Sequence, residues 1–432
     1  LCGDTFLTRL PDPVLQQLEH FGNPALGLND AFQAVSRYWD RITHPAQVLQ
    51  SLPSALATLL DPADCGPAFI ALPQDAQGWT YDYPVSFFKQ KVHRVRRQIP
   101  DIREINDAIA ALRAAKRPVI IAGGGVQYSK AVKELTNFAE TTNIPVIQTI
   151  AGRANFMENH KLNLGPVGVT GSDSGNWVAA RADVILSVGS RLQDFTTGSW
   201  TAFAKDAQLI SLNTARHDAG KHMALSLVGD AKLGLQAMQN KIDGYQAPSD
   251  WTRDAQVQRS KWDEYVVQNV KVGNRPNSYA QAIGVINAIC DPRDRIVAAA
   301  GGLPAEIAAN WRTLDIGTVD VEFGFSCMGY EIAGGWGARI AQSEVEPDQD
   351  TIVFAGDGSY LLMNSDIYSS VLTAKKMIVI VLDNGGFAVI NKLQSNTGNE
   401  SFNNLISDCP TVSDPFLVNF VEHATSMGAN AE

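Results

Sequence analysis

Two polar side chains, Asp357 and Asn384, stand in short glycine-bearing motifs. They belong to the segments Gly356-Asp357-Gly358-Ser359 and Asp383-Asn384-Gly385-Gly386. Asp357 offers a carboxylate and Asn384 an amide oxygen, and Mg²⁺ in proteins is bound by such hard oxygens together with phosphate groups and water. The glycines after Asn384 allow the carbonyl of Gly386 to turn inward as a third protein ligand. The two motifs therefore predict a magnesium site that also holds phosphate.

Each motif follows an apolar run of strand length, at 351–354 and 377–382, and a helical stretch, 361–374, lies between them. Adjacent parallel strands end at the same edge of a sheet, so we expect Asp357 and Asn384 to meet there. Gly356 and Gly358 allow close approach of the backbone, and the N–H groups of the turn through Ser359 would face a diphosphate. Either motif alone is ordinary turn chemistry, and their joint occurrence at two strand ends favours a ligand site.

The elements that must position these motifs form a repeated pattern of a short apolar run, a glycine-bearing loop and a stretch of helical period. The runs show no clean polar alternation, which is typical of strands covered on both faces. The alternation predicts the α/β fold class, with doubly wound parallel sheets in three domains. We expect strands at 68–72, 118–122, 144–147, 183–188, 208–212, 296–299, 351–354 and 377–382, and helices at 102–115, 129–141, 234–242 and 278–289.

The domain boundaries are expected where strand signals are missing. The segment 91–99 is basic, and the segment 246–275 is polar and poor in aliphatic side chains. The first and last domains are expected to be incomplete, because the pattern begins and stops partway through a unit. We expect a first domain at 1–90, a linker at 91–99, a central Rossmann-like domain at 100–245, a second linker at 246–275 and a last domain at 276–432.

Composition excludes several classes of protein. With 432 residues, 45% hydrophobic and 19% charged, the chain has the composition of a soluble globular protein. The formal net charge of −10 repels nucleic acid and anionic membrane, so neither is an expected partner. The apolar stretches are far shorter than the ~20 residues that span a bilayer. Five scattered cysteines indicate neither a disulfide framework nor a zinc site, and a cytoplasmic location is expected.

The paired motifs resemble the signature of thiamine-diphosphate-dependent enzymes, such as decarboxylases and acetolactate synthase. The resemblance implies thiamine diphosphate and Mg²⁺ as cofactors, with Asp357, Asn384 and the Gly386 carbonyl as metal ligands. The family signature usually ends in two asparagines, whereas the first position here is Asp383. Because the second asparagine is the ligand in the family, we expect the metal site to be intact.

Two further segments resemble parts of the same family site. The stretch 322–331 is similar to the segment that grips the aminopyrimidine ring. This similarity implies that the Ser326 carbonyl accepts from the 4′-amino group, that the Met328 N–H reaches a ring nitrogen, and that the Met328 side chain is wedged between the two rings. The segment Gly301-Gly302-Leu303 is similar to the first loop that contacts the diphosphate.

Longer segments resemble one branch of this family, over essentially the whole chain. Its members open a cyclic diketone of myo-inositol breakdown, trihydroxycyclohexane-1,2-dione, by hydrolysis to 5-deoxy-D-glucuronate. The resemblance implies this small cyclic polyol diketone as substrate, and a homodimer or homotetramer with the cofactor between subunits. The segments that carry the resemblance are 4–17, 36–42, 191–199 and 325–331.

The family also uses a glutamate that bonds to the pyrimidine ring and activates the cofactor. It comes from the N-terminal domain of the partner subunit, and we expect it to precede the segment present here. Residues 1–90 contain one glutamate, Glu19, in a helical stretch and not at a strand end. No catalytic residue is therefore expected in this chain, and the chain as given is expected to turn over nothing.

Two alternatives stay open on sequence alone. The same pair of motifs, 356–359 and 383–386, called the clamp below, would serve a carboligase of the acetolactate-synthase type or a decarboxylase, both of which act on 2-oxo acids. A catalytically inactive homologue or fragment could also keep the fold.

Overall fold

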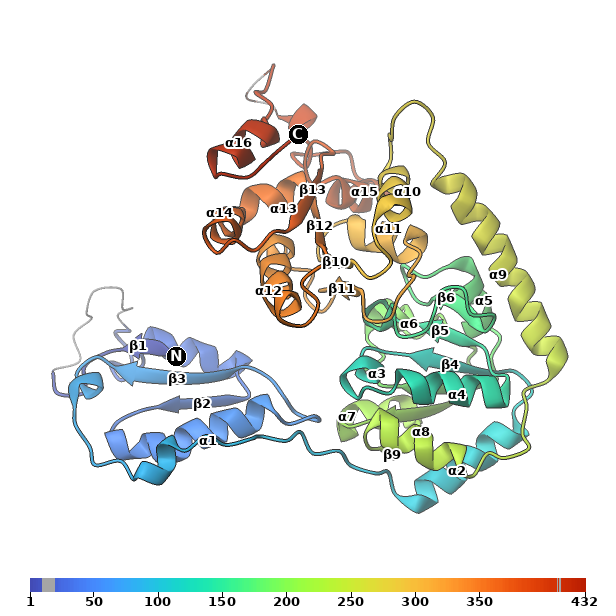
Figure 1. The fold of residues 1–432 in the computed structure, drawn as a ribbon, viewed down its shortest axis with the longest axis horizontal. Coiled ribbons are helices and arrows are strands. Elements are labelled where there is room, and N and C mark those ends of the chain that lie inside the picture. Colours follow the sequence, from blue (N-terminus) through green and yellow to red (C-terminus); the bar gives the residue numbers. More distant parts are fainter. Residues whose placement is uncertain (10–19, 410, 412) are drawn as a thin grey trace. The chain divides into compact units, whose positions relative to one another are not determined.

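The computed structural model describes residues 1–9, 20–409, 411 and 413–432, and contains three parallel sheets flanked by helices (Figure 1). The chain forms two compact units, residues 1–98 with 214–216, and residues 99–213 with 217–432. The predicted α/β class with parallel sheets is confirmed. The expected linker 91–99 has no helix or strand. The domain boundaries themselves stay predictions.

The first unit has a three-stranded sheet in the order β1-β3-β2, with both pairs parallel. Ile42, Ala55 and Ile70 form its buried apolar cluster on one face. Arg41 forms ion pairs with Asp4 and Asp30, which connect three segments of this unit. Its elements are β1 (Cys2–Asp4), η1 (Leu28–Val35), β2 (Tyr38–Arg41), η2 (Pro45–Gln47), α1 (Val48–Leu59), β3 (Ala68–Pro73), η3 (Ala76–Gly78) and η4 (Val85–Phe88).

The central sheet has six parallel strands in the order β6-β5-β4-β7-β8-β9. This is also the strand order of the classical dinucleotide-binding fold, the type of sheet expected for the central domain. Its elements are α2 (Ile102–Ala114), β4 (Pro118–Ala122), α3 (Gly125–Tyr128), α4 (Val132–Thr142), β5 (Val146–Gln148), η5 (Ile150–Gly152), β6 (Asn163–Pro166), α5 (Asp173–Ala179), β7 (Val184–Val188), α6 (Asp194–Thr197), β8 (Gln208–Asn213), α7 (Arg216–Ala219), η6 (Lys221–Met223), β9 (Leu225–Val228) and α8 (Ala231–Gln239).

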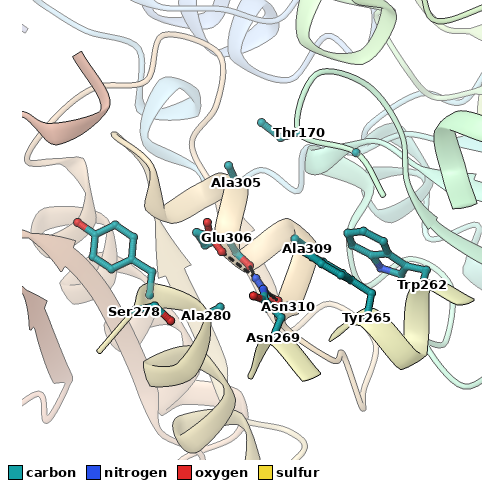
Figure 2. A pocket seen from close by; sticks show the side chains of 12 residues that line it. Thr170, Trp262, Tyr265, Asn269, Ser278, Ala280, Ala305, Glu306, Ala309 and Asn310 are labelled. Atoms are coloured by element: carbon teal, nitrogen blue, oxygen red, sulfur yellow. Dashed lines mark hydrogen bonds between the residues drawn. The ribbon is translucent and has the colours of Figure 1, made fainter. Parts of the chain in front are cut away.

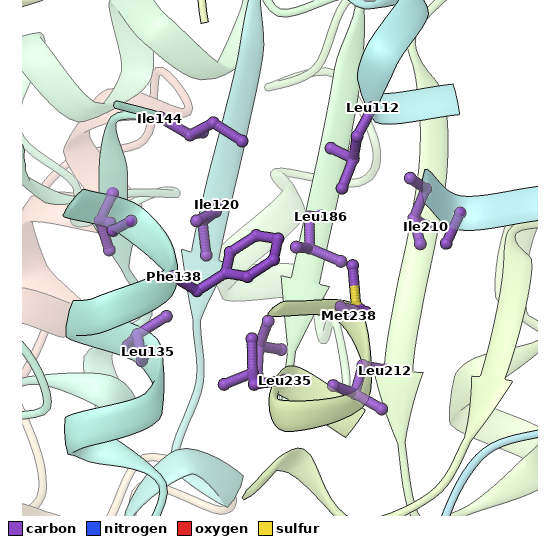
Figure 3. Close-up of a cluster of buried hydrophobic side chains, with 14 of the residues drawn as sticks. Leu112, Ile120, Leu135, Phe138, Ile144, Leu186, Ile210, Leu212, Leu235 and Met238 are labelled. Atoms are coloured by element: carbon purple, nitrogen blue, oxygen red, sulfur yellow. The ribbon is translucent and has the colours of Figure 1, made fainter. Parts of the chain in front are cut away.

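Alternate residues of each central strand enter different cores, because successive side chains of a strand point to opposite faces. Ile120 and Leu186 belong to one buried cluster, and Ile121 and Ile185 to the other. Figure 3 shows the first cluster, in which Phe138 of α4 and other helical side chains point toward the strand residues. The sheet is therefore covered on both faces, as the missing polar alternation predicts.

The last sheet has four parallel strands in the order β11-β10-β12-β13. It too has a buried cluster on each face, one with Ile352 and Phe354 and the other with Val353. The elements of this region are α10 (Tyr279–Ile289), β10 (Arg295–Ala298), α11 (Leu303–Asn310), β11 (Val319–Val321), α12 (Tyr330–Val345), β12 (Thr351–Gly356), α13 (Asp357–Leu362), α14 (Ser365–Leu372), β13 (Ile378–Leu382), α15 (Ala388–Asn396), η7 (Ile406–Asp408) and α16 (Phe420–Ser426).

The segment 246–275, expected as a linker, is mostly one long helix, α9 (Ser249–Asn269). It packs along α5 and β6 of the central sheet and also contacts α11 (Figure 1). Trp251 is buried, and its indole N–H donates to the Pro118 carbonyl at 2.9 Å. The inward face of the helix carries Trp251, Arg259 and Trp262 and few aliphatic side chains, so the sequence lacks the aliphatic pattern that predicts a packed helix.

A buried charge cluster lies where α9 meets the central and last sheets. Arg259 of α9 donates to Glu158 at 2.7 Å, and Arg312 donates to the same oxygen at 3.0 Å. Arg153 lies 3.1 Å from the other Glu158 oxygen and also donates to the Trp311 carbonyl at 2.8 Å. The cluster thus joins loops of the central sheet, α9 and the segment after α11.

The charge balance of this cluster decides the ionisation of Glu158. Burial alone would raise the pKa of Glu158, but Arg153, Arg259 and Arg312 outweigh it and lower the pKa to about 2. A carboxylate with a depressed pKa stabilises the fold above its unfolded pKa, and this stability is lost as the pH falls toward the folded value.

No helix among the described residues is long and apolar enough to cross a membrane.

We predict that Glu158→Gln lowers the free energy of unfolding at neutral pH by roughly 3–5 kcal/mol, because the buried guanidinium groups lose their carboxylate. Urea unfolding at pH 7 measures this loss. The difference between wild type and variant should shrink as the pH falls from about 5 toward 2, where Glu158 becomes protonated.

The matched control is Glu140→Gln, which changes an exposed carboxylate that is hydrogen-bonded to His160 in the same domain. Exposed pairs contribute about 0–1 kcal/mol, so this variant should unfold nearly as wild type does. Equal losses in the two variants would contradict the role given to the buried cluster.

Candidate functional site

The two predicted motifs meet at one edge of the last sheet. β12 and β13 pair in parallel, with Gly356 opposite Leu382, so the residues that follow each strand emerge together. Helix α13 begins at Asp357 directly after β12. The chain thus passes from strand to helix at the glycine turn, as the first motif predicts.

Asp357 is a buried carboxylate without a full set of partners. It is 3% exposed, and its Oδ1 accepts no hydrogen bond from any described residue. Burial and the neighbouring Asp383 carboxylate raise the pKa of Asp357, while backbone N–H groups of Gly358, Gly386 and Asn384 oppose this shift. An unsatisfied buried oxygen beside a second carboxylate fits a divalent cation. The cation would bind Oδ1 of Asp357 and offset the repulsion between the Asp357 and Asp383 carboxylates.

Asn384 is held by a residue that the sequence motifs do not include. Its amide nitrogen donates to the hydroxyl of Tyr279, at the start of α10. Burial raises the pKa of Tyr279, so the hydroxyl stays protonated at neutral pH. With its nitrogen engaged, the Asn384 amide oxygen remains available as an acceptor. Asp383 accepts from the Gly385 N–H at 2.9 Å and so shapes the turn after Asn384.

Two glycines of the clamp have no room for a side chain. A Cβ at Gly358 would lie 2.7 Å from the Phe387 ring and 3.2 Å from the Met328 methyl group. Gly386 has a φ of +139°, and a Cβ there would lie 2.4 Å from the Asn404 carbonyl oxygen. The structure therefore brings Met328 of the second predicted segment against the turn of the first.

The predicted pyrimidine segment forms a turn between β11 and α12. Ser326 has a φ of +53°, a conformation that is uncommon for a residue with a side chain and typical of functional turns. Ser326 is exposed and Met328 is half-buried. No hydrogen bond joins Ser326 to the clamp among the described residues.

The predicted diphosphate loop, 301–303, leads from β10 into α11. Gly301 has a φ of +80°, Gly302 precedes the first helical turn, and Leu303 is buried at its start. A Cβ at Gly302 would lie 3.7 Å from the Tyr279 ring, whose hydroxyl bonds Asn384. Tyr279 thus connects this loop with the predicted metal-binding motif.

A cavity of about 340 Å³ lies between α9, α10 and α11 (Figure 2). Trp262 and Tyr265 of α9 line one side, and Asn269, Asn310 and Glu306 form a hydrogen-bonded chain along the wall. These polar groups already satisfy one another. Of the residues around the clamp, only Tyr279 lines the cavity, and none of the predicted cofactor residues does, so we assign no ligand to it.

Several residues near the site have no role in the sequence motifs. Tyr279 and Phe387 are not part of them, and Glu331 stands in the pyrimidine segment without an assigned function. The position of Phe387 near the clamp is predictable from the sequence, because this residue directly follows Gly386. Glu19, the one glutamate of residues 1–90, lies outside the described residues, so its expected helical setting is not tested. The described residues contain no group of three or more His, Cys, Asp or Glu that could hold a metal ion, so a metal held by Asp357 would also need amide or carbonyl ligands.

Comparison with known proteins gives two family matches. Residues 105–238 match the thiamine pyrophosphate enzyme central domain, and residues 299–432 match the thiamine pyrophosphate enzyme C-terminal TPP binding domain. Together the two matches cover more than half of the chain. The second contains every predicted cofactor-binding residue, from Gly301 to Gly386.

Individual proteins are similar over nearly the whole chain. A 3D-(3,5/4)-trihydroxycyclohexane-1,2-dione hydrolase of Geobacillus thermodenitrificans is 39% identical over 424 residues, 93% of this chain. Proteins with the same name from Bacillus anthracis and Clostridium tetani are each 37% identical over 428 residues, also 93% of this chain. The chain spans 66% of the length of each of these relatives. The central and C-terminal matches, together with these relatives, show that the chain belongs to the thiamine pyrophosphate enzymes.

Proposed function

We propose that this chain is part of a thiamine-diphosphate-dependent hydrolase that cleaves a C–C bond of 3D-(3,5/4)-trihydroxycyclohexane-1,2-dione and yields 5-deoxy-D-glucuronate. The cofactor part rests on the buried, unsatisfied Oδ1 of Asp357 at the edge of the TPP binding domain. The substrate part rests on relatives of that name at 37–39% identity. The small cyclic diketone is accordingly the proposed substrate.

The proposed metal ligands are the carboxylate of Asp357, the amide oxygen of Asn384 and the carbonyl of Gly386. Residues Gly356 to Ser359 and Gly301 to Leu303 hold the diphosphate through their backbone N–H groups. Both segments lead into helices, whose N-terminal N–H groups favour anions. Met328, against Gly358, supports the rest of the cofactor.

The bound cofactor would supply a nucleophilic carbon and an electron acceptor for breaking the bond next to a ketone. The chain's own residues bind and orient it. The glutamate that activates the pyrimidine is proposed to come from outside these 432 residues. The absence of nucleic-acid and anionic-membrane partners remains a proposal supported by the net charge of −10, and a cytoplasmic location remains a proposal supported by the five scattered cysteines.

A homodimer or homotetramer is also proposed. Many large apolar side chains of the last region are exposed, among them Leu362 at 58%, Leu372 at 67% and Leu393 at 58%. Exposed apolar side chains of this kind would be covered in a subunit interface, which supports a second copy of the protein as the partner.

The substrate assignment is tested with the protein from the complete gene, supplied with thiamine diphosphate and Mg²⁺. We expect 5-deoxy-D-glucuronate from the cyclic diketone and no acetolactate or acetaldehyde from pyruvate, measured by chromatography of the products. Turnover of pyruvate without turnover of the diketone would favour the carboligase or decarboxylase alternative. Lack of turnover of both would favour an inactive homologue. The 432-residue chain alone is expected to be inactive.

We predict opposite effects of Asp357→Asn on binding and stability. Loss of the carboxylate should weaken Mg²⁺–thiamine-diphosphate binding by about a hundredfold or more, since even outer partners of metal ligands contribute about 10–100-fold. Calorimetric titration measures this change. The ligand-free variant should have a higher Tm at pH 7, because the raised pKa means that ionised Asp357 destabilises the fold.

This gain in Tm should disappear near pH 3, where the carboxyl is protonated in both folded and unfolded wild type. Asp348→Asn, at an exposed turn position of the same region, is the matched control and should change neither binding nor Tm. A lower Tm for Asp357→Asn at pH 7 would contradict the electrostatic reading of the site.

A further inference from the structure

Two glutamates hold the turn between β11 and α12. Glu322 accepts from the N–H groups of Phe325 and Cys327, both at 2.9 Å, one on each carboxylate oxygen. Glu331, in the first turn of α12, accepts from the N–H of Gly329 at 2.8 Å. Three N–H groups of this short turn are thus bound to carboxylates.

Glu331 also reaches the neighbouring loop. Its other oxygen accepts from the N–H of Ala300 at 3.0 Å, directly before Gly301. The side chain is 1% exposed, and the described residues provide no cationic partner for it. A buried carboxylate of this kind is costly unless hydrogen bonds satisfy both oxygens, which is what the two backbone N–H groups do here.

The hydrogen bonds to Glu322 and Glu331 do not use every backbone N–H group of the turn. Among the hydrogen bonds of the described residues, none involves the N–H of Ser326 or of Met328. Ser326 is held at a φ of +53°, a strained conformation that persists only where the surroundings impose it. The two carboxylates supply that constraint from both ends of the turn.

We infer that Glu322 and Glu331 are positioning residues for the cofactor's pyrimidine half. By occupying the N–H groups of residues 325, 327 and 329, they keep the Met328 N–H and the Ser326 carbonyl available to a ring with complementary donors and acceptors. Glu331 in addition fixes the start of the diphosphate loop through Ala300. This inference rests on the proposed function for the identity of the ring, and on the structure alone for the shape of the turn.

The test separates the two halves of the cofactor with two probes, measured by calorimetric titration in the presence of Mg²⁺. Thiamine diphosphate would contact the clamp, the loop at 301–303 and the turn, whereas inorganic pyrophosphate would contact the clamp and the loop but not the turn. Glu322→Gln should raise the Kd for thiamine diphosphate about tenfold and leave the Kd for pyrophosphate within about twofold. Glu331→Gln should weaken both ligands, because it also releases Ala300.

Glu344→Gln is the matched control, since Glu344 is an exposed residue of the same helix, and it should change neither Kd. Glu331→Gln removes a buried charge, which lowers the stability of the fold. The side chain of Glu322 is half-buried, so Glu322→Gln is the decisive variant for the two Kd measurements. Unchanged thiamine-diphosphate binding by Glu322→Gln, or equal weakening of both probes, would overturn the inference.

Hydrogen–deuterium exchange of ligand-free protein gives a readout that does not depend on the cofactor. Amides of the peptide spanning residues 322–331 should exchange faster in both variants than in wild type and in Glu344→Gln. The same exchange rate in all four proteins would show that the glutamates do not hold the turn. If the turn is held but wild type binds only pyrophosphate, the proposed function fails and the structural role of the glutamates stands.

Discussion

Parallel pairing of β12 with β13, in register from Ile352 opposite Ile378 to Gly356 opposite Leu382, decides where the predicted ligands lie. Because parallel strands end at a common edge, residues far apart in the sequence share one small volume. β10 pairs with β12 in the same direction and delivers the loop at 301–303 to the same edge. The apolar strand residues bury the sheet on both faces and so maintain the register on which this edge depends.

At that edge the structure carries charge that the protein alone does not satisfy. Asp357 is buried close to Asp383, and one of its oxygens has no hydrogen-bond partner among the described residues. The turn around Ser326 is held in a strained conformation. A fold optimised only for stability would avoid both features, and proteins retain them where ligand binding repays the cost. The site is thus organised before any ligand arrives, and stability is given up for that organisation.

Sequence reasoning predicted the repeated strand–helix units and the meeting of Asp357 with Asn384, because apolar runs and glycine turns are local signals. It missed β1, β2, β6, β9 and β11, which are short and contain polar residues such as Asp40, Asn163 and Asp320. It did not predict the helix α9 in the segment expected as a linker, because the inward face of this helix has aromatic and arginine side chains and few aliphatic ones. Tyr279 and Glu331 contact the site through long-range packing, which no single motif encodes. The roles of the predicted ligands remain predictions.

The contacts that α9 makes with both sheets also affect how the chain unfolds. Arg259 of this helix and Arg312 after α11 share Glu158, so the central and last sheets are joined by buried ionic contacts rather than by a free tether. Two sheets with separate cores would otherwise melt in separate steps. Breaking the shared carboxylate contacts exposes charge on both sides at once, which couples the two steps into one cooperative transition.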